Sequence, residues 1–247
     1  MKVIILLVLF YVQQSDQSPV DVETRGVNRR FDDGCGFCID ATHRNLHYWI
    51  EYINNATIPT NETCTSFCAK IPDIEAALVC DLYCPQYEIH NFLNFIKGSY
   101  EDPVYFCEQA SECFNSPGGA ADAFKASVSP KVGRAGVERI FVAFYNVTKP
   151  VGPGQFIISI ETVDGLPFKI SQFTDGTPVG PYGISAEINT VKKADCHPNV
   201  KPCETWKPGK YTINYKLCNC LCGSKAPISE VYFQGHATFT ISANSTA

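Results

Sequence analysis

The sequence lacks the short motifs that mark the common enzyme classes. It has no G-x-S-x-G nucleophile turn, no H-E-x-x-H zinc motif, no phosphate-binding G-x-x-x-x-G-K loop and no G-x-G-x-x-G dinucleotide fingerprint. Histidine is also scarce, with five in 247 residues. Only a site assembled from residues far apart in the chain would escape this search. We therefore predict a non-catalytic protein without a cofactor or a resident metal.

Long hydrophobic runs are absent after the first dozen residues. The run from Val3 to Val12 follows Met1-Lys2 and is much shorter than the ~20 residues of a membrane-spanning helix. Polar residues follow it at once, which is typical of a secretory signal peptide, predicted here over residues 1–18. The alternative is a buried N-terminal helix or strand. The signal peptide predicts a secreted, extracellular protein.

Positive charge is scarce in the first half of the chain. Between Cys35 and Cys113 three basic residues stand against eleven acidic ones, a net charge of −8, whereas the chain from Ser127 onward has a net charge of +4. An acidic surface is repelled by nucleic acids and, at neutral pH, by anionic membranes. The expected partners are other secreted protein subunits, with lipid or a membrane surface as the alternative and nucleic acid excluded.

Apolar periodicity and glycine content divide the remaining chain into four segments. They are a flexible leader over 19–33, a helical domain over 34–114, a linker over 115–130 and a β-rich domain over 131–247. Six strands are expected in the last segment, at Glu138 to Val147, Gln155 to Val163, Pro167 to Phe173, Ile184 to Lys192, Lys210 to Cys218 and Ser229 to Ser242. The predicted fold class is α + β with two domains, the second an antiparallel β-sandwich of immunoglobulin-like kind.

Eight of the thirteen cysteines lie in the helical segment. They are Cys35, Cys38, Cys64, Cys68, Cys80, Cys84, Cys107 and Cys113. Their order, together with the segment from Phe67 to Pro72, resembles the saposin family over about 80 residues. The resemblance implies an all-α domain stapled by disulfides between Cys35 and Cys113, Cys38 and Cys107, and Cys68 and Cys80.

The family pattern does not include Cys64 and Cys84. Residues four apart lie on one helix face, so two antiparallel helices that each carry C-x-x-x-C can be joined by a bridge from Cys64 to Cys84 outside the bridge from Cys68 to Cys80. A zinc site made of these four thiols is the alternative, which an oxidising compartment disfavours. The extra bridge is expected to oppose hinge opening of the domain.

Other candidate site residues are surface asparagines and apolar helix residues. Four N-x-S/T sequons predict glycosylation at Asn55, Asn61, Asn146 and Asn244. A saposin-like interior can contact lipid, and the candidates for this contact are Trp49, Ile50, Ile53, Ile89, Phe92, Leu93, Phe95 and Ile96. The alternative is that these eight side chains form an ordinary helical core.

Five cysteines lie in the second half, at Cys196, Cys203, Cys218, Cys220 and Cys222. Alternate residues of a strand share one face and lie too close in line to pair readily with each other. The C-x-C-x-C run is therefore expected to pair outward, with Cys196 and Cys203 as partners, and a soft-metal site is the alternative. Because five is odd, one thiol is expected to stay free, buried or available to another chain.

The whole arrangement resembles the countin family of social amoebae. The features shared are a signal peptide, an acidic saposin-type domain with an extra cysteine pair and a cysteine-containing β-rich part of about 120 residues. The resemblance implies a secreted component of a multi-subunit counting factor that limits the size of multicellular groups by altering adhesion and motility. The alternative is a lipid-transfer or membrane-permeabilising effector, a class that is commonly cationic, whereas this domain is acidic.

Overall fold

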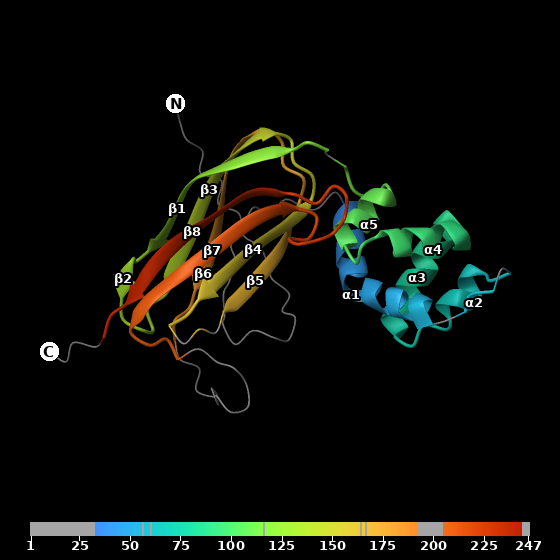
Figure 1. The fold of residues 1–247 in the computed structure, drawn as a ribbon, viewed down its shortest axis with the longest axis horizontal. Helices are drawn as coiled ribbons and strands as arrows, with labels where there is room; N and C mark the ends of the chain where they lie inside the picture. The colour runs from blue at the N-terminus through green and yellow to red at the C-terminus, as the bar shows by residue number, and fades with distance from the viewer. Residues whose placement is uncertain are drawn as a thin grey trace.

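The computed structural model describes residues 33–55, 57–59, 61–115, 117–163, 165, 167–191 and 205–243. The chain is α + β, with a small helical region followed by two β-sheets, and the helices lie at one end of the sheets (Figure 1). The predicted signal peptide, the predicted leader up to residue 32, Asn244, Cys196 and Cys203 lie outside the described residues. None of the described helices is both long and apolar enough to cross a membrane.

The helical region contains five helices in its described part. They are α1 (Asp33–Asn55), α2 (Cys64–Cys68), α3 (Ile74–Tyr87), α4 (Ile89–Gly98) and α5 (Pro103–Gln109). Three of them begin at side chains that accept hydrogen bonds from main-chain N–H groups of the first turn, namely Thr63, Asp73 and Asp102. These caps fix the helix starts because the first N–H groups of a helix have no partner inside it.

Trp49 is the centre of the helical core. Its side chain is fully buried, its indole N–H donates to the carbonyl oxygen of Ala76 at 2.9 Å, and its ring lies 5.4 Å from Phe92 and 5.9 Å from Phe106. These contacts join α1 to α3, α4 and α5. The hydrogen bond satisfies the only polar atom that this large side chain buries.

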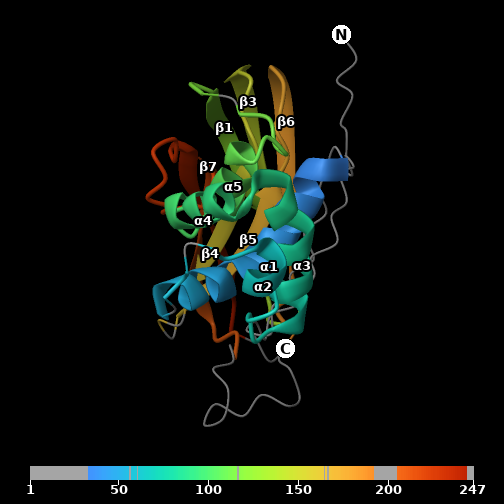
Figure 2. The same ribbon diagram turned by 90° about the vertical axis from the view of Figure 1, so that its right-hand side faces the viewer.

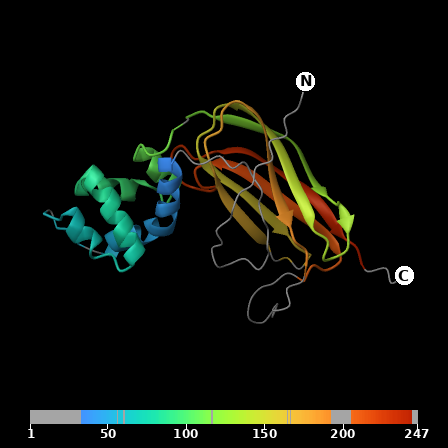
Figure 3. The same cartoon turned by 180° about the vertical axis from the view of Figure 1, so that it is seen from behind.

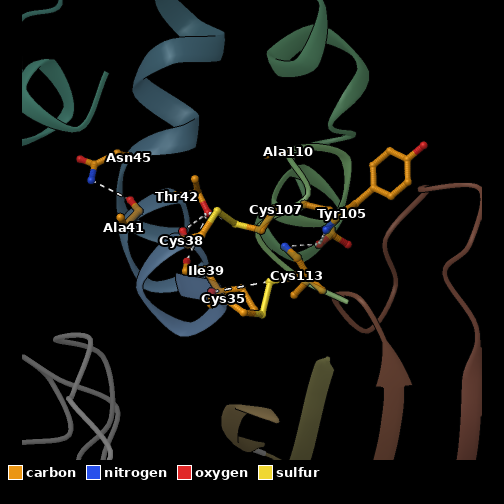
Figure 4. Close-up of a disulfide and its surroundings, with 12 residues drawn as sticks. Cys35, Cys38, Ile39, Ala41, Thr42, Asn45, Tyr105, Cys107, Ala110 and Cys113 are labelled. Atoms are coloured by element: carbon orange, nitrogen blue, oxygen red, sulfur yellow. Dashed lines mark hydrogen bonds between the residues drawn. A yellow bond between two sulfur atoms is a disulfide. The ribbon is translucent and has the colours of Figure 1, made fainter. Parts of the chain in front are cut away.

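Four disulfides hold the helices together. The bonded pairs are Cys35–Cys113, Cys38–Cys107, Cys64–Cys84 and Cys68–Cys80. The first two connect α1 to α5 and to the residues that follow it (Figure 4). The other two connect α2 to α3, one outside the other. Three of these pairs are those that the saposin resemblance implies, and Cys64–Cys84 is the outer bridge expected from the C-x-x-x-C spacing.

The β-rich part has eight strands in the described residues, in two sheets. The strands are β1 (Ala120–Ser129), β2 (Val132–Gly133), β3 (Arg139–Lys149), β4 (Gly154–Glu161), β5 (Phe168–Thr174), β6 (Gly180–Ile188), β7 (Gly209–Asn219) and β8 (Val231–Ile241). One sheet has the order β1-β3-β6 and the other β2-β8-β7-β4-β5, with all pairs antiparallel except β2 with β8. Figures 2 and 3 show the sheets as two layers behind and beside the helices.

One aromatic core lies between the two sheets. Phe141 of β3 lies 5.3 Å from Tyr215 of β7, and Tyr145 of β3 lies 5.0 Å from Phe233 of β8, measured between ring centroids. All four rings are buried and alternate with more exposed residues along their strands. This period of two is the pattern of strands with one buried face.

The prediction of a linker over 115–130 is wrong for residues 120–129, which form β1 and pair with β3 along their whole length. Two features conceal this strand in the sequence. Alanine contributes four of its ten residues, and a register shift between Ala123 and Lys125 interrupts the alternation of apolar and polar side chains. Such a bulge moves the following side chains to the other face, so a search for a strict period of two does not detect the strand.

Candidate functional site

An exposed apolar stripe runs along α3. Ile74, Leu78 and Leu82 are 79%, 65% and 48% exposed. Because they are spaced by four residues, they lie on one face of the helix. The other face of α3 is buried and carries Cys80 and Cys84, which the disulfides tie to α2. We call Ile74, Leu78 and Leu82 the α3 stripe; it is the surface of the helical region best suited to contact another molecule.

Acidic residues border the α3 stripe. Glu75 and Asp81 lie three residues before and after Leu78, and both are exposed. Glu75 forms an ion pair with Arg44 of α1, whose guanidinium also binds Asp40 at 2.8 Å. Arg44 is thus shared between two carboxylates, so the border of the stripe stays acidic. A partner that covers the stripe needs an apolar face with basic residues around it.

The α3 stripe was not predicted from the sequence, although α3 carries a local signal for it. The apolar residues of α3 occur all around the helix, which is more than one buried face needs. The cysteines mark the inner face, and the residues spaced by four from Ile74 lie on the other face. Reading the two sets separately would have identified the stripe.

The eight residues proposed for lipid contact lie in or against the helical core. Trp49, Ile53, Phe92, Leu93 and Ile96 are at most 7% exposed, and Ile50, Ile89 and Phe95 are partly buried and pack on the same cluster. Lipid could reach the buried side chains only if the helices separated. The three sequon asparagines in the described residues, Asn55, Asn61 and Asn146, are exposed.

Asp102 joins the helical region to the β-rich part. It is fully buried, and its Oδ1 accepts hydrogen bonds from the N–H groups of Val104 and Tyr105 at 2.9 and 3.1 Å. Its Oδ2 accepts from the N–H of Leu221, in the connection between β7 and β8, at 2.9 Å. One carboxylate therefore both caps α5 and bonds across the junction. Charge-assisted bonds of this kind are stronger than neutral ones.

Glu108 of α5 is a second buried carboxylate at this junction. Its side chain is 6% exposed, and neither oxygen has a hydrogen-bond partner within the part of the chain that the structure describes. Burial raises the pKa of Glu108 to about 7, and the charge of Asp102 adds to this effect. Burial also raises the pKa of the neighbouring Cys220 thiol, which therefore stays protonated and unreactive.

We expect Glu108 to make the free energy of unfolding depend on pH. The buffer contains EDTA so that no divalent cation binds the carboxylate. The folded pKa of about 7 exceeds the unfolded value of 4.5, so the contribution of Glu108 is fully present below pH 4.5 and is lost as the pH rises through 7. The loss is on the order of 3 kcal/mol. Urea unfolding of wild type and Glu108→Gln at pH 5 and pH 8 gives the part of the pH dependence that comes from Glu108. Equal pH dependence in the two proteins would contradict the expectation.

The prediction that the C-x-C-x-C run pairs only outward is wrong, since Cys218 and Cys222 are bonded to each other. Outward pairing requires one continuous strand, but β7 ends at Asn219 and Cys220 has a φ of 60°. This left-handed residue turns the chain, so the Cα atoms of Cys218 and Cys222 lie 5.3 Å apart. Cys220 is the free thiol of the described residues and lies buried within the helical core cluster.

The described residues contain no group of three or more His, Cys, Asp and Glu side chains arranged to hold a metal ion. Asp102, Glu108 and Cys220 come together at the junction, but the carboxylate of Asp102 is fully engaged by main-chain N–H groups and the thiol of Cys220 is fully buried. The junction therefore resembles a structural contact more than a reaction centre.

Comparison with known proteins gives matches over both parts of the chain. The model of the countin N-terminal domain matches residues 30–111, and that of the countin C-terminal domain matches residues 121–246. Countin-1 of Dictyostelium discoideum is 28% identical over 212 residues, which cover 85% of this chain and 78% of that protein. Countin-3 of the same organism is 23% identical over 208 residues, covering 84% and 89%.

Countin-2 of Dictyostelium discoideum is 24% identical over 210 residues, which cover 84% of this chain and 78% of that protein. Among solved structures, the C-terminal domain of wzt matches 54% of this chain and 80% of its own at a TM-score of 0.37 and 10% identity. A similarity this low carries no conclusion about fold or function.

Proposed function

This chain belongs to the countin family, and from that premise we propose that it is a secreted, non-catalytic component of an extracellular multi-subunit complex. The complex would limit the size of multicellular groups by altering adhesion and motility. The five disulfides among the described residues support secretion, since such bonds persist in oxidising compartments. The exposed sequons would carry glycans.

Two structural assignments are part of this proposal. The helical region would be a saposin-type domain, which the nested order of its cysteine pairs supports. The two sheets would form an immunoglobulin-like sandwich, which their shared aromatic core supports. In this assignment the disulfides keep the helices closed, and the domain acts through its surface rather than through an opened interior.

The observation that carries the proposed function is the α3 stripe. Three large apolar side chains on one exposed helix face are costly in water and favour burial against another protein. The occupant we propose is a different protein subunit with an apolar face and a basic border, because Glu75 and Asp81 flank the stripe and the segment from Cys35 to Cys113 has a net charge of −8. The same charge opposes adsorption to anionic membranes at neutral pH.

We expect Leu78→Ser to weaken the complex about 30-fold, because the buried leucine contributes on the order of 2 kcal/mol at the centre of such an interface. The stability of the isolated chain should change by less than about 0.5 kcal/mol, since the side chain is exposed there. The measurement is the native mass of the secreted protein by light scattering after size-exclusion chromatography, under non-reducing conditions.

Val179→Ser is the matched control, since Val179 is an equally exposed apolar residue, at 60%, in the β-rich part. It should leave the native mass unchanged. If Leu78→Ser also leaves a large assembly intact, the α3 stripe is not the contact surface. A wild-type protein that elutes as a glycosylated monomer with extractable lipid would contradict the proposed function itself.

A further inference from the structure

Three oxygen atoms from separate segments surround Gly152, which lies buried in the connection between β3 and β4. A Cβ atom on Gly152 would lie 3.4 Å from Oε1 of Glu108, 3.5 Å from Oδ1 of Asn219 and 3.6 Å from the main-chain oxygen of Phe114. All three are hydrogen-bond acceptors. They come from α5, from the end of β7 and from the chain just after α5, so both parts of the protein contribute.

The side-chain oxygens at this point have no donor. Among the described residues, neither oxygen of Glu108 nor Oδ1 of Asn219 has a hydrogen-bond partner, although the two side chains are only 6% and 3% exposed. The Asn219 amide is held in its orientation because Nδ2 donates to the carbonyl oxygen of Ile228 at 2.8 Å. Its oxygen therefore faces away from that bond. Buried acceptors without partners are costly and rare, so this cluster requires a counterpart.

The neighbouring groups do not supply that counterpart. Asp102 is another carboxylate, already bonded by three main-chain N–H groups, and its charge repels Glu108. The Tyr232 hydroxyl can donate as well as accept, but among the described residues it forms no hydrogen bond to Glu108 or Asn219. The junction therefore gathers buried oxygen atoms and negative charge with no cation of the described chain bonded to Glu108.

We propose that this junction is a binding site for a hard divalent cation of the Ca²⁺ class, with Glu108, Asn219 Oδ1 and the Phe114 carbonyl as protein ligands. Ca²⁺ is bound by carboxylate, amide and main-chain carbonyl oxygens, and water fills its remaining positions. Because Gly152 has no side chain, no Cβ atom lies against these oxygens. The site would clamp the helical region to the β-rich part, and it is independent of the proposed function.

The donor set predicts a weak site. One ligating carboxylate in a partly preformed cage corresponds to dissociation constants on the order of 0.1–1 mM, the range of extracellular calcium modules. The test uses the purified full chain with CaCl₂ as the probe. At 10 mM CaCl₂ we expect the melting temperature to rise by roughly 5 °C relative to EDTA, and calorimetric titration to give one site per chain.

Three variants make the test specific. Gly152→Ala places a methyl group against the three ligand oxygens, and its contacts of 3.4 Å or more leave room for the methyl group in the fold. Glu108→Gln removes the ligand charge and keeps the side-chain shape. Both should lower the Ca²⁺ affinity at least tenfold and reduce the shift by about half or more. Glu51→Gln, which neutralises an exposed carboxylate of α1, should keep the wild-type Ca²⁺ affinity and the shift in melting temperature.

Several results would overturn this inference. A wild-type protein without a shift at 10 mM CaCl₂ has no such site. A shift of equal size with NaCl at matched ionic strength would be charge screening, and a shift retained in full in Glu108→Gln would place the cation elsewhere. If Gly152→Ala does not fold, as judged by circular dichroism in EDTA, Glu108→Gln against Glu51→Gln decides alone.

Discussion

Replacing all four cysteines that join α1 to α5 by alanine is expected to destabilise the helical region by roughly 7 kcal/mol, enough to unfold it. The bonds Cys35–Cys113 and Cys38–Cys107 close loops with sequence separations of 78 and 69 residues. The first bridge to form restricts a long unfolded chain and contributes about 4 kcal/mol. The second then closes only the short ring between the bridges and contributes about 3 kcal/mol.

Removing one of these two bridges should therefore cost only about 3 kcal/mol, because the other still closes the long loop. The measurement is urea unfolding of the full chain, monitored by far-ultraviolet circular dichroism. It compares the quadruple variant with the two variants that each lack one bridge. Removal of Cys218–Cys222, with a sequence separation of four, is the control and should leave the unfolding of the helices unchanged. A quadruple variant that costs no more than one pair would contradict the nested arrangement.

Arg139→Met is expected to destabilise the β-rich part by about 4 kcal/mol. Arg139 is fully buried at the start of β3 and lies 4.9 Å over the ring of Phe239. Its Nη1 donates to the carbonyl of Val137 at 2.7 Å and to the hydroxyl of Thr190 at 2.9 Å. Its Nη2 donates to two further carbonyls, of Gly133 and Arg134.

Methionine fills most of the same volume but donates no hydrogen bond, so all four bonds are lost. The Val137 carbonyl still accepts from the Thr190 hydroxyl and the Gly133 carbonyl from the Ser242 N–H, whereas the Arg134 carbonyl loses the bond from Nη2. Loss of the buried charge offsets part of this cost, since burial also lowers the pKa of Arg139. Thermal unfolding of the full chain measures the change, with the exposed Arg134→Met as the matched control. A cost below about 1 kcal/mol would mean that the charge penalty equals the value of the hydrogen bonds.

The positions of the cysteines and the apolar periods predicted much of the fold. Trp49 with Ile53, and Phe92 with Ile96, are each spaced by four residues, which predicted an apolar face on each helix, and all four side chains are buried. Strand β1 was missed because its bulge breaks the only local signal. The bond between Cys218 and Cys222 was missed because a local pattern does not show where a strand ends and the chain turns.

The sequence by itself determined the family, the order of helices before strands and the cysteine framework of the helical region. These follow from local periods and from the spacing of one reactive residue type along the chain. Only the tertiary structure decided which groups meet at the junction, because Glu108 and Asn219 lie in different parts of the chain and have no pattern in common. Burial then changes their chemistry, since a carboxyl group that is ionised in water at neutral pH has its pKa raised to about 7 when it is buried without a partner.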